Sequence, residues 1–418
     1  MTDQLEVWIS DQTLGPDARV GTLFRTIGRG GETVRFEYAD EWLHRGEPPI
    51  GFAIDPEIPL YAGPHHASGN ARLQGIFRDT APDRWGRVLM ERREALEAKD
   101  ERRPARNLRD WDFLVGVNDQ TRMGALRLRD PIGQSYLDNR ERGAPPMTRL
   151  RELEAVVANL ERPDAESQSE YPEWLRQLIV PGTSLGGARP KASYLAEDGS
   201  LWLAKFPASE DRRDVGLWEF LAHRLAIRSG VDRPPAARFR FSDRGHTFAA
   251  QRVDRQGSSR RLYASAMTLL QHADGDAGSY LEIAEAIEQV GVPREIRTDL
   301  AQLYRRILFS ILVGNRDDHF RNHGFLRAPG GWRLSPAFDI NPNPDKDEHS
   351  LCIDATDPRP LSQSLVATRE YYRLSASQAA MIEGEVRKAV AGWRQEASAL
   401  GVGAGEISVL QGVVDPDR

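Results

Sequence analysis

The chain has 418 residues, of which 40% are hydrophobic and 28% are charged, a composition typical of a globular protein with more than one domain. Its formal net charge of −6 argues against a protein that coats nucleic acid by bulk attraction. We expect no membrane-spanning helix and no signal peptide, because no apolar run is long enough and residues 1–4 do not open a basic and then apolar leader. The single cysteine, Cys352, excludes an internal disulfide, so a reducing, cytoplasmic location is expected.

The first hundred or so residues carry the patterns of strands and of one helix. Apolar and polar residues alternate at 5–9 and at 34–38, which predicts two strands. A helix is predicted to begin near Pro82 and to run through Leu96. We therefore expect a mixed α/β subdomain in this part of the chain.

A polar stretch rich in turn residues, 131–146, is predicted to be a linker. Thr148 follows it as the expected N-cap of a helix whose apolar face runs from Leu150 to Leu160. Beyond this helix the character of the sequence changes, because glycine, proline and lysine gather after Val180.

The segment from residue 184 to 253 alternates turns, strands and one helix. The hairpin signal Glu197–Ser200 separates two predicted strands, and the second strand carries Lys205. Only five of the 56 basic residues are lysines, which favours a role for Lys205 that needs a compact point charge. The predicted order is a glycine-rich turn, two strands, a helix and a strand, at 184–191, 192–195, 201–206, 215–225 and 247–253. This order is typical of the small lobe of a protein kinase.

A long apolar helix precedes the densest polar cluster of the chain. Its apolar residues recur at helical spacing from Leu300 to Ile311, and it is expected to end at Gly314. The cluster Asn315–His323 then places two acids, two histidines and two amides within nine residues. Polar groups at such density are costly to bury without partners, so we expect them to form a site.

Asp339 is a lone acid in an apolar stretch, seventeen residues after Asn322. Between them, Pro329–Gly331 predicts a hairpin that returns Asp339 beside Asn322. Phosphoryl transfer requires an acid that accepts the proton of the attacking hydroxyl, here Asp317, and metal ligands, here Asn322 and Asp339. The spacing D-x-x-x-x-N carries little weight alone, but together with Lys205 and the order of elements it predicts a kinase site.

Several polar residues leave alternatives open. Asp318 and His323 suit structural roles as well as direct ones, and His319 either anchors its loop or contacts a nucleotide. The glycine-rich segment is not a Walker A loop, because Pro190 occupies the place of the glycine before the lysine. It is either a plain turn or a loop in which N–H groups at 186–188 bind anionic oxygens.

Four motifs occur in a fixed order: Ser184–Lys191 (SLGGARPK), Gln251–Arg255 (QRVDR), Asn315–Asn322 (NRDDHFRN) and Pro336–Asp339 (PAFD). Together they resemble the HipA serine/threonine kinases, the toxin halves of bacterial type II toxin–antitoxin pairs. Residues 77–86 (FRDTAPDRWG) are similar to the segment that marks the N-terminal subdomain of that family. The resemblance covers about residues 5–390.

The resemblance implies an α+β fold, namely a bilobal protein-kinase-like fold with a small β-rich lobe and a larger helical lobe, behind an N-terminal α/β subdomain. The segments expected on this basis are the N-terminal subdomain, a linker helix with the small lobe, the helical lobe and a tail, at 1–147, 148–255, 256–400 and 401–418.

The resemblance also implies the residues of the site. Asp317 would be the catalytic base, and Asn322 and Asp339 would hold Mg²⁺. Ser184 would be the site of an inactivating autophosphorylation, and Glu219 an ion-pair partner of Lys205. The ATP-binding residues that it implies are Gly186, Gly187, Ala188, Arg189, Lys191, Lys205, Gln251, Arg252, Val253, Asp254, His319, Asn322 and Asp339.

Within this set the glycine-rich loop would cover the phosphates and Lys205 would contact the α- and β-phosphates. Residues 251–253 would line the adenine, with Asp254 near the ribose. Two residues depart from the family pattern: Arg189 stands in place of a glutamine, and Val253 in place of a common aromatic residue.

The implied activity is transfer of the γ-phosphate of ATP to a serine or threonine of a protein, with an aminoacyl-tRNA synthetase as the expected substrate, which halts translation and promotes dormancy. The implied partners are a HipB-like helix-turn-helix antitoxin and, through it, operator DNA. Two other functions stay open: a co-repressor with little catalysis, and a metal hydrolase. The hydrolase lacks an H-E-x-x-H motif and would use Asp317, Asp318, His319, His323 and Asp339.

Overall fold

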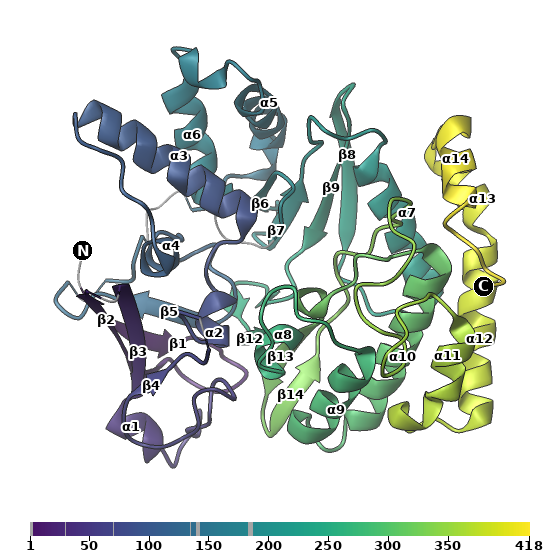
Figure 1. Ribbon diagram of the computed structural model, residues 1–418, viewed down its shortest axis with the longest axis horizontal. Helices are drawn as coiled ribbons and strands as arrows, with labels where there is room; N and C mark the ends of the chain where they lie inside the picture. Colours follow the sequence, from purple (N-terminus) through teal and green to yellow (C-terminus); the bar gives the residue numbers. More distant parts are fainter. Residues whose placement is uncertain (1–2, 30, 70, 134, 139–142, 183–186) are drawn as a thin grey trace. The chain divides into compact units, whose positions relative to one another are not determined.

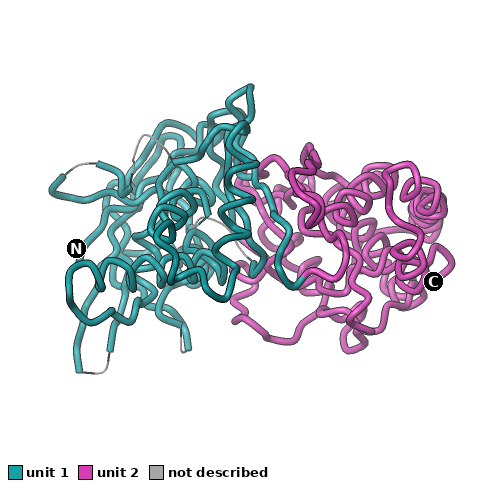
Figure 2. The backbone as a smooth tube through the Cα atoms, turned by 90° about the horizontal axis from the view of Figure 1, so that it is seen from above, with its two compact units in different colours: residues 1–210, 254–264 teal, residues 211–253, 265–418 magenta. Residues whose placement is uncertain are grey.

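The computed structural model describes residues 3–29, 31–69, 71–133, 135–138, 143–182 and 187–418. The chain forms two compact units (Figure 2): unit 1 comprises 1–210 and 254–264, and unit 2 comprises 211–253 and 265–418. The four segments expected from the sequence remain a prediction. In the part of the chain that the structure describes, no helix combines the length and apolar character needed to cross a membrane.

Unit 1 begins with a five-stranded antiparallel sheet (Figure 1). Its strands at 4–9 and 31–38 are buried on alternate residues, with Val7, Val34 and Phe36 nearly inaccessible, because successive side chains of a strand point to opposite faces. The strands predicted at 5–9 and 34–38 are therefore confirmed. In spatial order the strands are β4 (His65–His66), β3 (Gly31–Tyr38), β2 (Ala18–Gly28), β1 (Gln4–Ile9) and β5 (Leu126–Arg129).

Unit 1 also contains several helices. The longest is α3 (Arg84–Asp100), which confirms the helix predicted to begin near Pro82. Its N-cap is Asp83, whose side chain accepts a hydrogen bond from the main-chain N–H of Arg84 at 2.8 Å. The expectation that Thr148 caps a helix is wrong. Thr148 lies inside a 3₁₀ turn, so the following helix starts from Arg149 without a side-chain cap. The other helical elements are α1 (Asp40–Leu43), α2 (Gly75–Arg78), α4 (Asp110–Val115), η1 (Met147–Arg149), α5 (Leu150–Leu160), η2 (Ala165–Ser167) and α6 (Tyr171–Gly182).

Two hairpins complete unit 1. The predicted hairpin is present as β6 (Lys191–Leu195) and β7 (Leu201–Lys205), which pair antiparallel. Its turn is closed by the Asp198 carboxylate, which accepts from the N–H of Ser200 at 2.9 Å. The second hairpin, β10 (Arg255–Gln256) with β11 (Ser259–Arg260), was not predicted. The short β12 (Tyr263–Ser265) follows, where the chain passes from unit 1 to unit 2.

Unit 2 is mainly helical. Its first helix, α7 (Val215–Arg228), packs on the hairpin β8 (Ala236–Ser242) and β9 (Gly245–Gln251). The contact is close because Gly216 lacks a side chain: a Cβ there would lie 1.9 Å from the carbonyl oxygen of His246. The N-cap of α7, Asp214, accepts from Leu217 N at 3.1 Å and from His246 N at 2.9 Å, which ties the helix to β9.

The core of unit 2 is α10 (Ile296–Val313), and every residue from Arg306 to Val313 is buried. Its last seven residues, 307–313, are apolar except for Ser310, as expected of a segment that lies inside a domain. Two further helices, α9 (Tyr280–Val290) and α12 (Ala376–Ala391), pack against α10. The antiparallel hairpin of β13 (Gly324–Ala328) and β14 (Gly331–Leu334) follows, as predicted from Pro329–Gly331. The remaining elements are α8 (Ala266–Leu269), α9 (Tyr280–Val290), η3 (Phe320–Asn322), α11 (Ser362–Ala367), η4 (Arg369–Tyr372), α12 (Ala376–Ala391), α13 (Trp393–Leu400) and α14 (Ala404–Gln411).

Candidate phosphotransfer site

The polar cluster of unit 2 begins where α10 ends. Gly314 has φ +70°, a left-handed conformation that favours glycine, and a Cβ at this position would lie 2.2 Å from the Val413 side chain. The chain therefore turns sharply out of the helix. Asn315 follows and is fixed at once, because its N–H donates to the Ser310 carbonyl at 2.9 Å and its Nδ2 donates to the Ser310 hydroxyl at 3.3 Å.

A pocket of about 220 Å³ in unit 2 brings together the three residues to which the sequence assigned the chemistry, Asp317, Asn322 and Asp339. Asp317 and Asn322 precede the β13–β14 hairpin in the chain, and Asp339 follows it. The hairpin therefore returns Asp339 to the pocket that Asn322 lines, as predicted. The other residues that line it are Arg213, Val215, Asn315, Asn341, Pro342 and Asn343. The lining is thus made of two carboxylates, several amides and one guanidinium.

Asp317 is the accessible acid of the cluster, with 59% of its side chain exposed. Its carboxylate forms an ion pair with Lys346. Its main-chain carbonyl accepts from Asn322 Nδ2 at 3.2 Å, which closes the turn from 317 to 322. An acid held in this way on a rigid turn, yet open to solvent, is accessible to a group on another molecule.

Asp318, its neighbour, is buried and points into a network of its own. Its Oδ2 accepts from the Tyr280 hydroxyl at 2.9 Å, and its Oδ1 lies 3.1 Å from His323 Nε2. Burial acts to raise the pKa of Asp318, but His323, Tyr280 and His349 together hold that pKa below its usual value. Burial also lowers the pKa of His349 to about 4. Neither Asp318 nor His323 lines the pocket, and both are buried.

Asp339 follows β14 and has a left-handed backbone, with φ +55°, which is uncommon for a residue other than glycine. Its segment is tied to the cluster, because Asn341 N donates to Asn315 Oδ1 at 3.1 Å. Asn341 Oδ1 is buried and has no hydrogen-bond partner among the described residues. Carboxylate and amide oxygens are the ligands that Mg²⁺ accepts.

A half-buried arginine, Arg233, lies in the electrostatic field of both Glu219 and Asp339. Burial lowers the pKa of Arg233 to about 10, while Glu219 and Asp339 act to raise it. Its Nε donates to Nδ1 of His223 at 3.3 Å. Glu219 is buried on α7 in unit 2, whereas Lys205 belongs to unit 1, so the ion pair expected between them remains a prediction.

In unit 1, the glycine-rich segment is held by the start of α3. The N–H of Gly187 donates to Asp83 Oδ2 at 2.6 Å, and the Gly187 carbonyl accepts from Trp85 N at 3.2 Å. Trp85 Nε1 donates to the Lys191 carbonyl at 3.1 Å, and Lys191 faces Lys205 in the β6–β7 register. Ala188 and Arg189 lie between these fixed points, and Ser184 and Gly186 lie outside the described residues.

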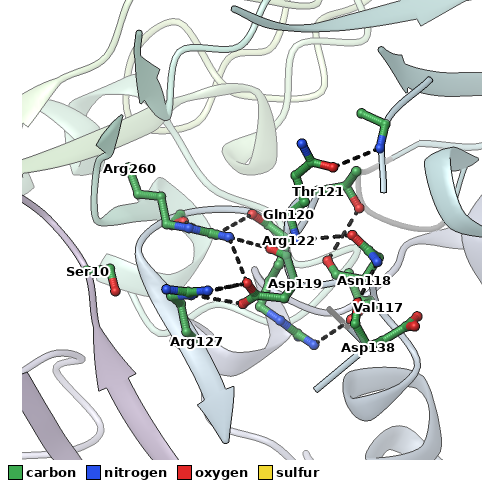
Figure 3. A network of polar contacts seen from close by, with 12 residues as sticks. Ser10, Val117, Asn118, Asp119, Gln120, Thr121, Arg122, Arg127, Asp138 and Arg260 are labelled. Carbon is green, nitrogen blue, oxygen red and sulfur yellow. Dashed lines mark hydrogen bonds and ion pairs between the residues drawn. The ribbon is translucent and has the colours of Figure 1, made fainter. Parts of the chain in front are cut away.

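Asp254 is wholly buried in unit 1. Its Oδ2 accepts from the Gly124 N–H at 2.7 Å and pairs with Arg255. Nearby, Asp119 lies between Arg127 and Arg260 (Figure 3), with Arg127 Nε 3.0 Å from Oδ1. These contacts fix the hairpin 254–264 to unit 1. The ribose contact assigned to Asp254 remains a prediction.

The remaining candidate residues lie in unit 2. Gln251 ends β9, and its N–H donates to the Pro235 carbonyl at 2.9 Å. Arg252 is buried and Val253 half-buried in the connection that follows. His319 does not line the pocket, and its Nδ1 is buried without a hydrogen-bond partner among the described residues.

Sequence reasoning missed several residues of this region. Arg213, Asn341 and Asn343 line the pocket, and Lys346 contacts Asp317. Lys346 carried a usable signal, because lysine is rare in this arginine-rich chain. Arg213 carried none, since it is one of many arginines and stands more than a hundred residues before Asp317.

The comparisons with known proteins agree with these elements. Two family models match: the HipA N-terminal domain over residues 5–128 and the HipA-like C-terminal domain over residues 183–394, which is half of the chain. The chain belongs to the HipA family.

Solved structures add a likeness of fold. HipA of Shewanella oneidensis MR-1, solved in a toxin–antitoxin complex with HipB and operator DNA, superposes with a TM-score of 0.62 at 16% identity, over 97% of this chain and 94% of that one. The predicted class, a kinase-like α+β fold behind an N-terminal α/β subdomain, is thereby confirmed. The proinflammatory kinase CtkA of Helicobacter pylori matches 50% of this chain and 90% of its own, at 13% identity and a TM-score of 0.34. No curated protein sequence matches the chain.

Proposed function

We propose that this protein is an ATP-dependent serine/threonine protein kinase. The observation that carries the proposal is the pocket of unit 2, which Asp317, Asn322 and Asp339 line together. In the proposed step the hydroxyl oxygen of a serine or threonine attacks the γ-phosphorus of ATP, and Asp317 takes the hydroxyl proton. A new O–P bond forms, the bond from the γ-phosphorus to the bridging β–γ oxygen breaks, and ADP leaves.

The exposure of Asp317 supports a substrate that is itself a protein. A hydroxyl on a large molecule must approach from solvent, and the Asp317 side chain is 59% exposed. The turn closed by Asn322 Nδ2 fixes the main chain that carries this carboxylate, so little backbone reorganisation is needed when the hydroxyl arrives.

The donor set suits Mg²⁺, with Asn322 and Asp339 as the proposed ligands. Both line the pocket, and Asn341 adds a buried amide oxygen without a hydrogen-bond partner among the described residues. When bound there, Mg²⁺ would neutralise charge on the phosphates of ATP. The described residues contain no group of three or more His, Cys, Asp or Glu side chains arranged around one metal, so the hydrolase alternative gains no support.

The biological role proposed is that of a toxin. HipA of Shewanella oneidensis is described as part of a toxin–antitoxin system with HipB and operator DNA, and this chain shares its family and fold. We propose a HipB-like antitoxin as partner, operator DNA through that antitoxin, and an aminoacyl-tRNA synthetase as substrate. Autophosphorylation at Ser184 would switch the kinase off, since a phosphate there adds negative charge to the loop proposed to cover the phosphates of ATP and would repel them.

The test is incubation of the purified protein with Mg²⁺ and γ-labelled ATP, alone and with a bacterial lysate, followed by mapping of labelled serines and threonines. We expect label on the protein itself and on a lysate protein, and none with Asp317→Ala. A wild-type protein that binds its antitoxin and transfers no label would identify the co-repressor alternative instead.

A further inference from the structure

Lys346 reaches the proposed catalytic base from a distant part of the chain. Its ammonium forms an ion pair with Asp317 Oδ1 and also lies 3.4 Å from the Ser350 hydroxyl. Both partners of the ion pair are accessible, with 45% of the Lys346 side chain and 59% of the Asp317 side chain exposed. An accessible ion pair contributes little to stability. Stabilisation of the fold therefore does not account for the presence of a lysine beside Asp317.

The main chain around Lys346 is fastened to the loop that carries Asp317. The Lys346 carbonyl accepts from the Arg316 guanidinium, and Arg316 is itself buried. In return the Arg316 carbonyl accepts from Ser350 N at 3.0 Å, and Asn343 N donates to the Gly314 carbonyl at 2.9 Å. The segment 343–350 is therefore held along 314–317 by main-chain bonds, which fix the base of the lysine side chain.

Besides the Mg²⁺ proposed at Asn322 and Asp339, the charges around the pocket favour a cation beside Asp317. Two carboxylates, Asp317 and Asp339, line it, and the one guanidinium of the lining, Arg213, is already paired with Asp345. A phosphoryl group that approaches Asp317 would meet like charge, which costs Coulomb energy. An ammonium on the oxygen of that same carboxylate offsets the repulsion where the acceptor hydroxyl and the phosphoryl group meet.

We propose that Lys346 is a second catalytic residue of this site, whose ammonium binds the non-bridging oxygens of the transferring phosphoryl group. The proposal rests on the kinase function proposed above. As the acceptor oxygen bonds to the γ-phosphorus and the bond to ADP breaks, Asp317 takes the hydroxyl proton. Lys346 keeps its own protons and donates hydrogen bonds to the phosphoryl oxygens. Phosphoryl transfer is catalysed mainly by positioning and by such electrostatic stabilisation.

The experiment compares Lys346→Ala and Lys346→Arg with Lys388→Ala, an exposed lysine on α12. Two quantities are measured: the rate of single-turnover phosphate transfer from Mg·ATP, and the dissociation constants of Mg·ADP with and without aluminium fluoride, a mimic of the transferring phosphoryl group. For Lys346→Ala we expect transfer about 10²-fold slower and the fluoride complex weakened about as much, with Mg·ADP alone changed less than about threefold. Lys346→Arg should recover part of both, because it keeps the charge.

Three results would overturn the proposal. Unchanged transfer in Lys346→Ala would make the ion pair a surface contact only. Faster transfer would mean that Lys346 restrains Asp317. Equal weakening of Mg·ADP with and without fluoride would place the lysine on the nucleotide rather than on the transferring group. Failure of the kinase function itself is distinct, because the wild type and Lys388→Ala would then transfer no phosphate.

Discussion

Two regions of the molecule are rich in charge, and they use it in opposite ways. In unit 1 (Figure 3), Asp119 is almost fully buried between Arg127 and Arg260, and the buried Arg122 donates to the carbonyls of Leu114 and Val117 at 2.9 and 2.8 Å. In unit 2, Asp317 and Asp339 are exposed and line a pocket.

The difference teaches that a cluster of charged residues indicates a site only when it leaves charge accessible. The unit 1 network pairs its carboxylate with two guanidinium groups and bonds Arg122 to main-chain carbonyls, which is how buried charge is tolerated. The pocket in unit 2 instead keeps carboxylate and amide oxygens available to a ligand. The contrast predicts that substitutions in the pocket will lower activity but not stability, and that substitutions in the unit 1 network will lower stability.

The largest expected effect is on activity, in the pocket. Asp317→Ala and Asp339→Ala should each slow phosphate transfer by about 10³-fold or more, because they remove the proposed base and a proposed metal ligand. The melting temperature should stay near that of the wild type, since both side chains are exposed. Rates of autophosphorylation and thermal melts measure the two quantities. Normal transfer in Asp317→Ala would contradict the assignment of the base.

The next effect falls on stability, in the network. Asp119→Ala should lower the free energy of unfolding by about 3 kcal/mol, because it strips a buried partner from Arg127 and Arg260. Denaturant unfolding measures it, with Asp164→Ala, which breaks an exposed pair with Arg162, as a control expected to change nothing measurable. Equal stability of the two variants would remove the contrast drawn above.

The same carboxylate has a pH signature. Burial acts to raise the pKa of Asp119, but Arg127 and Arg260 outweigh it and the pKa lies below its usual value. Such a group stabilises the fold above the ordinary carboxyl pKa, near 4, and the stabilisation is lost as pH falls through the lower folded pKa. Asp119→Asn should therefore be destabilised at neutral pH and show a weaker acid dependence than the wild type.

A third, smaller effect concerns Lys205, which ends β7 opposite Lys191. Lys205→Ala should weaken ATP binding by about tenfold or more, because it removes a poorly screened positive charge from the expected phosphate contacts. Lys99→Ala, on the exposed side of α3, should bind ATP normally. Titration with a fluorescent ATP analogue compares the two, and equal affinities would count against the small-lobe interpretation.

The effect that is smallest at neutral pH, and that grows only in acid, comes from a buried histidine that is not paired with an acidic residue. Burial, with Arg233 and Arg224 nearby, lowers the pKa of His223 to about 3. The unfolded chain takes up the proton near pH 6.5, so stability is complete above that pH and falls as pH drops toward 3. The expected slope is about 1 kcal/mol per pH unit, and it should flatten in His223→Phe when unfolding is followed between pH 4 and 7.

Much of the fold was accessible from the sequence because the signals are local. The alternation in β1 and β3, the turn before β7 and the helical spacing of α10 each depend on a few neighbouring residues. Thr148 failed as a cap for a local reason as well, since Met147–Arg149 forms a 3₁₀ turn that displaces the helix start. The strand β8, with arginines among its apolar residues, was not predicted.

The candidate site divides in the same way. Asp317 and Asn322 could be predicted because they are five residues apart in one turn, so their spacing in the sequence sets their spacing in the structure. Asp339 could be predicted because a tight hairpin connects it to that turn. Lys346 and Arg213 reach the region through tertiary contacts that no sequence period encodes. The membership of 254–264 in unit 1 was equally hidden, since Arg255 and Arg260 bind carbonyls more than a hundred residues away.

That hairpin makes the two units inseparable by a single cut. The chain leaves unit 1 after residue 210, returns to it at Asp254 and leaves again after Ala264, so neither unit is one continuous stretch. A fragment that stops at residue 210 would lack Arg260 and leave Asp119 with Arg127 alone. A split form of this protein would therefore have to be rebuilt from four pieces, and an insertion after residue 210 would separate the two stretches of unit 1 while leaving both stretches of unit 2 uninterrupted.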